Sequence, residues 1–92
     1  MARAIATLTV MPSSPDVDLA ALESSVKKKI IAFAGKTEMK VEVKPVAFGL
    51  NSVNITFVMD EAQGSPDAVA EEVSAFEDVS SAEITDVRRA VG

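Results

Sequence analysis

The chain has 92 residues, which is enough for one small domain and too short for a second hydrophobic core. It carries 9 Lys and Arg against 14 Asp and Glu, and this net charge of −5 argues against a general binder of nucleic acids or anionic membranes. The absence of Cys and His excludes disulfides, thiolate nucleophiles and the commonest metal ligands, while 48% hydrophobic residues are typical of a folded domain.

The first half of the chain predicts a strand, a helix and a second strand. Residues 4–10 alternate with period two, and Ala4, Ala6, Leu8 and Val10 share one face. A helix follows, capped by Asp16 or Asp18 and ended by Gly35. Its apolar residues step by three and four, which forms one stripe: Leu19, Leu22, Val26, Ile30 and Phe33. In the second strand, Met39, Val41 and Val43 alternate with charged residues and are expected to face the core.

The second half predicts a strand, a helix and a last strand. Residues 52–59 place Val53, Ile55, Phe57 and Met59 on one face. Ser65 and Pro66 open a helix, since Ser suits the cap and Pro the first helical position, and its stripe is Val69, Val73 and Phe76. Residues 79–81 are expected to form a turn, and residues 82–87 the last strand.

The element order β-α-β-β-α-β predicts an α+β, ferredoxin-like fold. Its four-stranded antiparallel sheet would carry both helices on one face. The opposite face would be mixed and polar: Thr7, Thr9, Lys40, Glu42, Asn54, Thr56, Glu83 and Thr85. We expect residues 1–92 to form a single domain. No apolar run approaches the roughly 20 residues of a membrane span, and residues 1–3 lead straight into a strand pattern, so we expect a cytoplasmic location.

The chain lacks the complete sequence motifs for metal or nucleotide binding. Asp16 and Asp18 resemble the start of a calcium loop, but Ala21 and Lys27 stand where that loop needs Gly and Glu, so we predict no metal site. The four glycines are scattered and form no nucleotide-binding loop, so no cofactor is expected. Lys27–Lys29 is best explained as a solvated helix face.

Two common functions of this fold are also disfavoured. An acylphosphatase needs an arginine in an anion-binding loop after the first strand, and the loop Met11–Pro15 has none. RNA binding through the sheet needs exposed aromatic residues on a basic surface. The chain has no Tyr or Trp, and only Phe48 among its 4 Phe lies outside a buried pattern.

Two segments are not explained by folding alone. Pro45–Leu50 places a proline, an aromatic residue and a glycine between two strands, where a polar turn is expected. Phe48 either caps one end of the core or contacts a partner. Arg88 and Arg89 form a cationic spot near the end of an acidic chain, and this spot serves either solubility or binding.

With these segments, the chain resembles the archaeal elongation factor 1-beta family, the counterpart of the C-terminal exchange domain of the eukaryotic factor. Met11–Leu19 is similar to the start of the family, Pro45–Leu50 to its central proline–aromatic–glycine motif, and Ile84–Arg89 to its archaeal ending. The similarity covers essentially the whole length of the chain.

The resemblance implies a translation factor that promotes exchange of GDP for GTP on elongation factor 1-alpha, a GTPase, without bond chemistry. It implies that Phe48 packs against the GTPase. It also implies that Arg89, with Arg88, disturbs the magnesium and phosphate site, where eukaryotic members use a lysine. We expect a monomer when free, without direct contact to nucleic acid or membrane.

Two alternatives from other classes stay open. One is a small-molecule-sensing regulatory domain of the ferredoxin-like type, which would usually dimerise and would need a ligand crevice. The other is a hydrolase of the acylphosphatase kind, which a direct assay with an acyl phosphate would detect.

Overall fold

The structure, a computed structural model, describes residues 3–35, 37–46 and 49–90. Its elements follow the expected order, which confirms the predicted β-α-β-β-α-β succession. In chain order they are β1 (Arg3–Pro12), α1 (Leu19–Ala34), β2 (Met39–Pro45), β3 (Asn51–Asp60), the 3₁₀ helix η2 (Glu61–Gln63), α2 (Asp67–Ser74) and β4 (Val79–Ala90).

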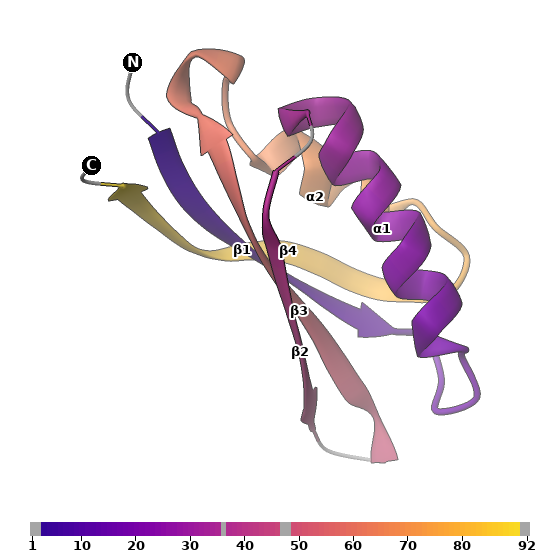
Figure 1. The fold of residues 1–92 in the computed structure, drawn as a ribbon. Helices are drawn as coiled ribbons and strands as arrows, with labels where there is room; N and C mark the ends of the chain where they lie inside the picture. Colours follow the sequence, from indigo (N-terminus) through magenta and orange to yellow (C-terminus); the bar gives the residue numbers. More distant parts are fainter. Residues whose placement is uncertain (1–2, 36, 47–48, 91–92) are drawn as a thin grey trace.

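The strands form one 4-stranded sheet in the order β2-β3-β1-β4, and every neighbouring pair is antiparallel. Both helices lie on the same face of this curved sheet (Figure 1). The arrangement confirms the predicted ferredoxin-like fold. β1 and β3 occupy the centre, so β2 and β4 are the two edges of the sheet.

The core lies between the sheet and the helices. The predicted alternation holds along both central strands, because the residues on the helix side are at most 4% exposed: Ala4, Ala6, Leu8, Val10, Val53, Ile55, Phe57 and Met59. From α1, Leu22, Val26 and Ile30 fill the space above them, while Leu19 and Phe33 pack at its margin. The helical stripe and the strand alternation therefore meet as the sequence predicts.

The ends of α1 are fixed by the residues expected to do so. Of the two candidate caps, Asp18 is the one used, since its Oδ1 accepts hydrogen bonds from the amides of Ala20 (3.0 Å) and Ala21 (3.3 Å). At the other end Gly35 has φ 78°, and its N–H donates to the Ile31 carbonyl at 2.8 Å. A left-handed φ of this kind favours glycine, so Gly35 ends the helix.

The second helix differs in detail from the expectation. α2 begins at Asp67, one residue later than predicted, with Pro66 at the cap position and the Ser65 hydroxyl accepting from the Asp67 amide at 3.2 Å. Val69 and Val73 are buried as predicted. Phe76 is half-buried against the core from a position beyond the end of the helix.

The turn predicted at residues 79–81 is wrong. These residues begin β4, and Val79, which is 7% exposed, pairs with Pro12. The chain turns earlier, over residues 75–78, where the Val79 amide donates to the Phe76 carbonyl at 3.1 Å. Burial and strand pairing of a β-branched residue favour a strand more than the two serines that follow it favour a turn.

The face of the sheet without helices is polar, as predicted. Hydroxyl and amide groups link the strands across it, with Thr9 Oγ1 donating to Asn54 Oδ1 at 2.8 Å and lying 3.0 Å from Thr85 Oγ1. Thr7 and Thr56 lie opposite each other with their hydroxyls 3.2 Å apart. Cross-strand polar pairs of this kind stabilise the sheet without a second layer.

Candidate functional site

The segments singled out from the sequence lie at diagonally opposite corners of the sheet (Figure 1). The hairpin between β2 and β3 closes one end, where the Val46 amide donates to the Leu50 carbonyl at 2.8 Å. The C-terminal end of β4, on the other edge strand, reaches the opposite end of the sheet, where Arg3 pairs with both Asp60 and Ala90. The two segments therefore form separate surfaces.

Phe48, the predicted anchor, falls between Val46 and Leu50 in the sequence and lies outside the described residues. The described residues that precede it in the sequence include exposed apolar side chains. Val43 is 49% exposed and Val46 is 37% exposed, although both are β-branched aliphatic residues. We call Val43, Pro45 and Val46 the hairpin patch.

The prediction that Val43 lies in the core is wrong. The strand register places it on the helix side, opposite Val53, which is fully buried. However, β2 is an edge strand, and the hairpin end of β2 and β3 extends beyond both helices (Figure 1). Alternation in the sequence identifies the face of a strand but not whether a helix covers that part of the face, so this exposed valine was missed.

Arg88 and Arg89 point to opposite faces of the sheet, because successive strand residues alternate. Arg89 pairs with Ala4, which belongs to the buried helix side, and Arg88 pairs with Ile5 on the other side. Their ion pairs agree with this placement. Arg88 Nε lies 2.9 Å from Asp86 Oδ2 on the same strand, whereas Arg89 Nε lies 3.0 Å from Glu61 Oε1.

The corner around Arg89 combines charge with an exposed apolar side chain. Val87 precedes the two arginines and is 52% exposed, and its register with Ala6 places it on the same side of the sheet as Arg89. The stretch from 45 to 87 contains nine acidic residues and no basic one, so Arg88 and Arg89 are the first cations after Lys44. We call Val87, Arg89 and Glu61 the terminal patch.

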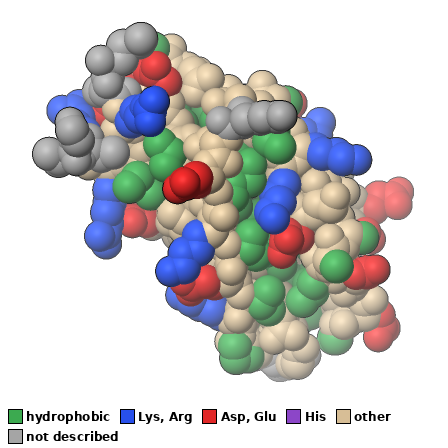
Figure 2. All heavy atoms as spheres, in the orientation of Figure 1, with side chains coloured by type: hydrophobic (Ala, Val, Ile, Leu, Met, Phe, Trp, Pro, Cys, Tyr) green, Lys and Arg blue, Asp and Glu red, His purple; other side chains and the backbone are tan. Residues whose placement is uncertain are grey.

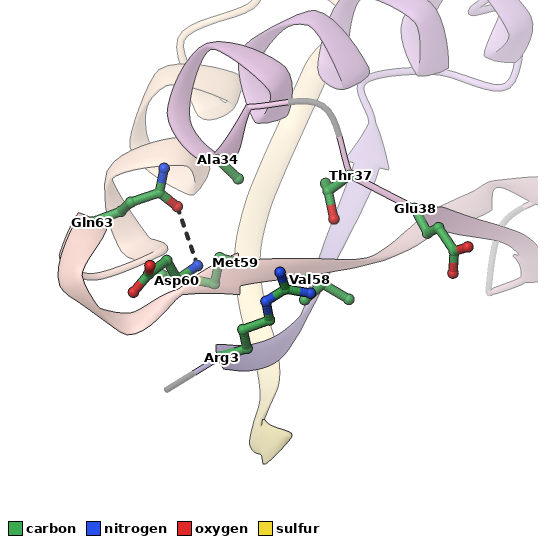
Figure 3. A pocket seen from close by; sticks show the side chains of 8 residues that line it. All are labelled: Arg3, Ala34, Thr37, Glu38, Val58, Met59, Asp60 and Gln63. Atoms are coloured by element: carbon green, nitrogen blue, oxygen red, sulfur yellow. Dashed lines mark hydrogen bonds between the residues drawn. The ribbon is translucent and has the colours of Figure 1, made fainter. Parts of the chain in front are cut away.

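An open groove of about 620 Å³ lies at the same end of the sheet (Figure 3). Its walls come from the start of β1, the end of α1, the connection between α1 and β2, the end of β3 and η2, with side chains of both charges: Arg3, Ala34, Thr37, Glu38, Val58, Met59, Asp60 and Gln63. In Figure 3 the Arg3 side chain points toward Val58, and Gln63 Oε1 accepts from the Asp60 amide at 3.2 Å. A groove with both charges suits polar contacts with a protein surface.

Two further structural findings concern site chemistry and membranes. Within residues 3–35, 37–46 and 49–90, no three acidic side chains converge in a way that could hold a metal ion. In the same described part of the chain, no helix is long and apolar enough to cross a membrane.

On the face seen in Figure 2, acidic and basic side chains are interspersed.

Two solved structures that resemble this fold have low sequence identity to the chain. A de novo designed protein, Foldit4, matches with a TM-score of 0.63 at 13% identity, with 98% of each chain covered. The BlrP1 BLUF structure matches with a TM-score of 0.58 at 12% identity and covers 100% of this chain and 57% of that one. At such identities these similarities support the fold alone.

Sequence comparisons are more specific. Archaeal proteins named elongation factor 1-beta are similar over 97% of this chain and 98% of their own length, with 43% identity in Methanothermobacter thermautotrophicus and 40% in Methanobrevibacter smithii. The family described as the EF-1 guanine nucleotide exchange domain matches residues 5–90, a range that includes both corners described above. The chain therefore belongs to the EF-1 guanine nucleotide exchange domain family, and its function is guanine nucleotide exchange in translation elongation.

Proposed function

We propose that this chain stimulates exchange of GDP for GTP on elongation factor 1-alpha by binding the nucleotide-free GTPase more tightly than the GDP-bound form. The observation that carries this proposal is the match of the exchange-domain family to residues 5–90. The whole of residues 1–92 would act as one domain, in the cytoplasm where elongation takes place, and as a monomer when free. It would bind neither nucleic acid nor membrane directly.

Exchange needs differential binding and no bond chemistry, which suits a chain without His or Cys. The factor and GDP each weaken the binding of the other to the GTPase by the same factor. To weaken GDP binding a hundredfold, the factor must prefer the empty GTPase by about 2.7 kcal/mol. Two surface contacts can supply a difference of this size, since a single buried aromatic anchor contributes on the order of 2 kcal/mol.

We assign the anchor to Phe48 in the hairpin and the cation to Arg89, with Arg88 as a helper. The exposed hairpin patch supports the anchor, because aliphatic side chains around an aromatic residue exclude water from its contact. The position of Arg89 supports the cation, since a guanidinium on the helix side of the sheet can compete for the phosphates and carboxylates of a nucleotide site. Arg88 lies on the other face, so its contribution would be smaller.

The test is release of fluorescent GDP from elongation factor 1-alpha at increasing concentrations of this protein. We expect the parent to accelerate release, Phe48→Ala to slow the stimulated release several-fold, and Arg89→Ala to lower the maximal rate more than the affinity. Lys28→Ala and Ile31→Ala remove an exposed cation and an exposed aliphatic side chain from α1 and serve as controls. If the parent shows no preference between GDP-bound and empty GTPase, the proposed function fails.

A further inference from the structure

The contact between Glu61 and Arg89 joins two elements that are distant in the sequence. Glu61 begins η2 directly after β3, and Arg89 lies near the end of β4, yet Glu61 Oε1 accepts a hydrogen bond from Arg89 Nε at 3.0 Å. We propose that Glu61 is a positioning residue that orients the guanidinium of Arg89 for its contact with the GTPase. This inference rests on the proposed function, because it assigns a role to a neighbour of the proposed cation.

Glu61 accepts its hydrogen bond from Nε of Arg89, and this determines which N–H groups of Arg89 remain for another contact. A guanidinium has five N–H donors in one plane, and a single hydrogen bond at Nε uses one of them. Within residues 3–35, 37–46 and 49–90 this is the one hydrogen bond of the Arg89 side chain, which leaves four N–H donors on the two terminal nitrogens. Guanidinium recognises a phosphate or a carboxylate with two parallel hydrogen bonds. Glu61 therefore restricts the plane of the guanidinium without occupying its binding edge.

Glu61 can orient another residue because its own backbone is fixed. The neighbouring Asp60 and Gln63 form a reciprocal capping box, in which Asp60 Oδ1 accepts from the Ala62 amide at 2.9 Å and Gln63 Oε1 accepts from the Asp60 amide at 3.2 Å. The Gly64 amide donates to the Glu61 carbonyl at 3.4 Å. The side chain of Glu61 takes no part in this cap, so its replacement leaves the cap intact.

The second arginine supplies a matched comparison within the same strand. Arg88 Nε lies 2.9 Å from Asp86 Oδ2, so the two ion pairs use the same guanidinium atom at nearly the same distance. The arginine side chains are also similarly exposed, at 77% and 73%. The difference is that the Arg88–Asp86 pair is local to β4 and lies on the face without helices.

The expected effect is on exchange rather than on folding. Exposed ion pairs contribute little to the stability of a protein. An arginine that is already oriented loses less side-chain freedom when it docks, and loss of an orientation held by an exposed ion pair is expected to cost about two- to fivefold in rate. Because Arg89 is assigned to the exchange step, the loss should fall on the maximal rate of GDP release and not on the concentration of half saturation.

The experiment compares Glu61→Ala, Glu61→Gln, Asp86→Ala and Arg89→Ala in the fluorescent GDP release assay with elongation factor 1-alpha. Circular dichroism and melting curves check that each variant is folded. We expect Glu61→Ala to lower the maximal rate about two- to fivefold. Glu61→Gln should keep most of the parental rate, since its amide oxygen can still accept from Nε. Asp86→Ala should lose less than Glu61→Ala, because Arg88 is assigned the smaller contribution.

A double variant separates positioning from an independent effect. If Glu61 acts through Arg89, Glu61→Ala should cause no further loss in a protein that already carries Arg89→Ala. A further loss in that background would overturn the inference, as would equal rates for Glu61→Gln and Glu61→Ala, because the charge of Glu61 would then be the property that matters. A faster rate for Glu61→Ala would also overturn it, since Glu61 would then restrain Arg89.

The inference and the proposed function fail in different ways. If Arg89→Ala slows release but Glu61→Ala matches the parent, the positioning role is wrong and the proposed function stands. If Arg89→Ala itself matches the parent, the assigned role of Arg89 is wrong and the role of Glu61 fails with it. If the parent does not stimulate release at all, the proposed function is wrong.

Discussion

Asp18 and Asp16 show how far a single residue can be interpreted from the sequence. Both are carboxylates before the same helix, and either could accept hydrogen bonds from its first free amides. Asp18 has the extended backbone of a cap, with φ −71° and ψ 103°, and its side chain accepts from two amides of α1, whereas Asp16 lies in the turn before it. The sequence pattern identified the kind of residue, and the exact start of the helix decided which of the two is used.

This pair gives a prediction with a built-in control. Asp18→Ala leaves the Ala20 and Ala21 amides without their side-chain acceptor, so it should lower the free energy of unfolding by about 1 kcal/mol. Asp16→Ala should change it by less than about 0.5 kcal/mol, because Asp16 is an exposed residue outside the helix. Urea denaturation of both variants measures the difference. Equal losses would contradict the assignment of the cap.

The elements were predictable where local pattern and tertiary burial agree. Along β1 and β3 the alternating residues are the buried ones, and along α1 the apolar stripe faces the sheet. The prediction was wrong where pairing between distant segments determines the structure. Val79 was expected in a turn, but it pairs with Pro12 and belongs to β4. The prediction was wrong again at Val43, because the extent of the helix layer over an edge strand is a property of the whole fold.

Two adjacent isoleucines in α1 test the orientation of the helix. Ile30 is fully buried, whereas Ile31 is 42% exposed. Ile30→Ala removes three carbons from a packed core and should lower the free energy of unfolding by about 2–5 kcal/mol. Ile31→Ala removes the same atoms from the surface and should change it by less than about 0.5 kcal/mol. The denaturation midpoints of the two variants give the comparison, and similar losses would mean that α1 packs with a different face.

At the scale of the whole molecule, the sequence identified the two candidate surfaces but did not show how they lie relative to each other. The central motif and the two arginines can be found by their composition. However, the predicted last strand stopped at Val87, and only β4, which extends to Ala90, places Arg88 and Arg89 on opposite faces of the sheet. Glu61 could not be found in this way. It is 28 positions from Arg89 in the chain, and only the pairing of β1 with both β3 and β4 brings the two together.

The separation of the corners leads to a prediction about how the two proposed contacts combine. β3 alone spans the sheet from Asn51, next to the hairpin, to Asp60, next to Arg3, a length of about 30 Å at the usual rise per strand residue. The described part of the molecule extends 41 Å along its longest axis. Val46 and Leu50, which flank Phe48 in the sequence, therefore lie too far from Arg89 to share a contact with it.

Substitutions this far apart usually have additive effects, within about 0.5 kcal/mol. The double variant Phe48→Ala/Arg89→Ala should therefore slow GDP release by the product of the two single losses, within about twofold. The measurement is the rate of fluorescent GDP release at one fixed, subsaturating concentration of factor. Glu61→Ala/Arg89→Ala is the comparison, because those side chains are in contact and their losses should not multiply. If the Phe48 and Arg89 losses also failed to multiply, the two corners would be acting on one site of the GTPase, and the assignment of two separate contacts would be wrong.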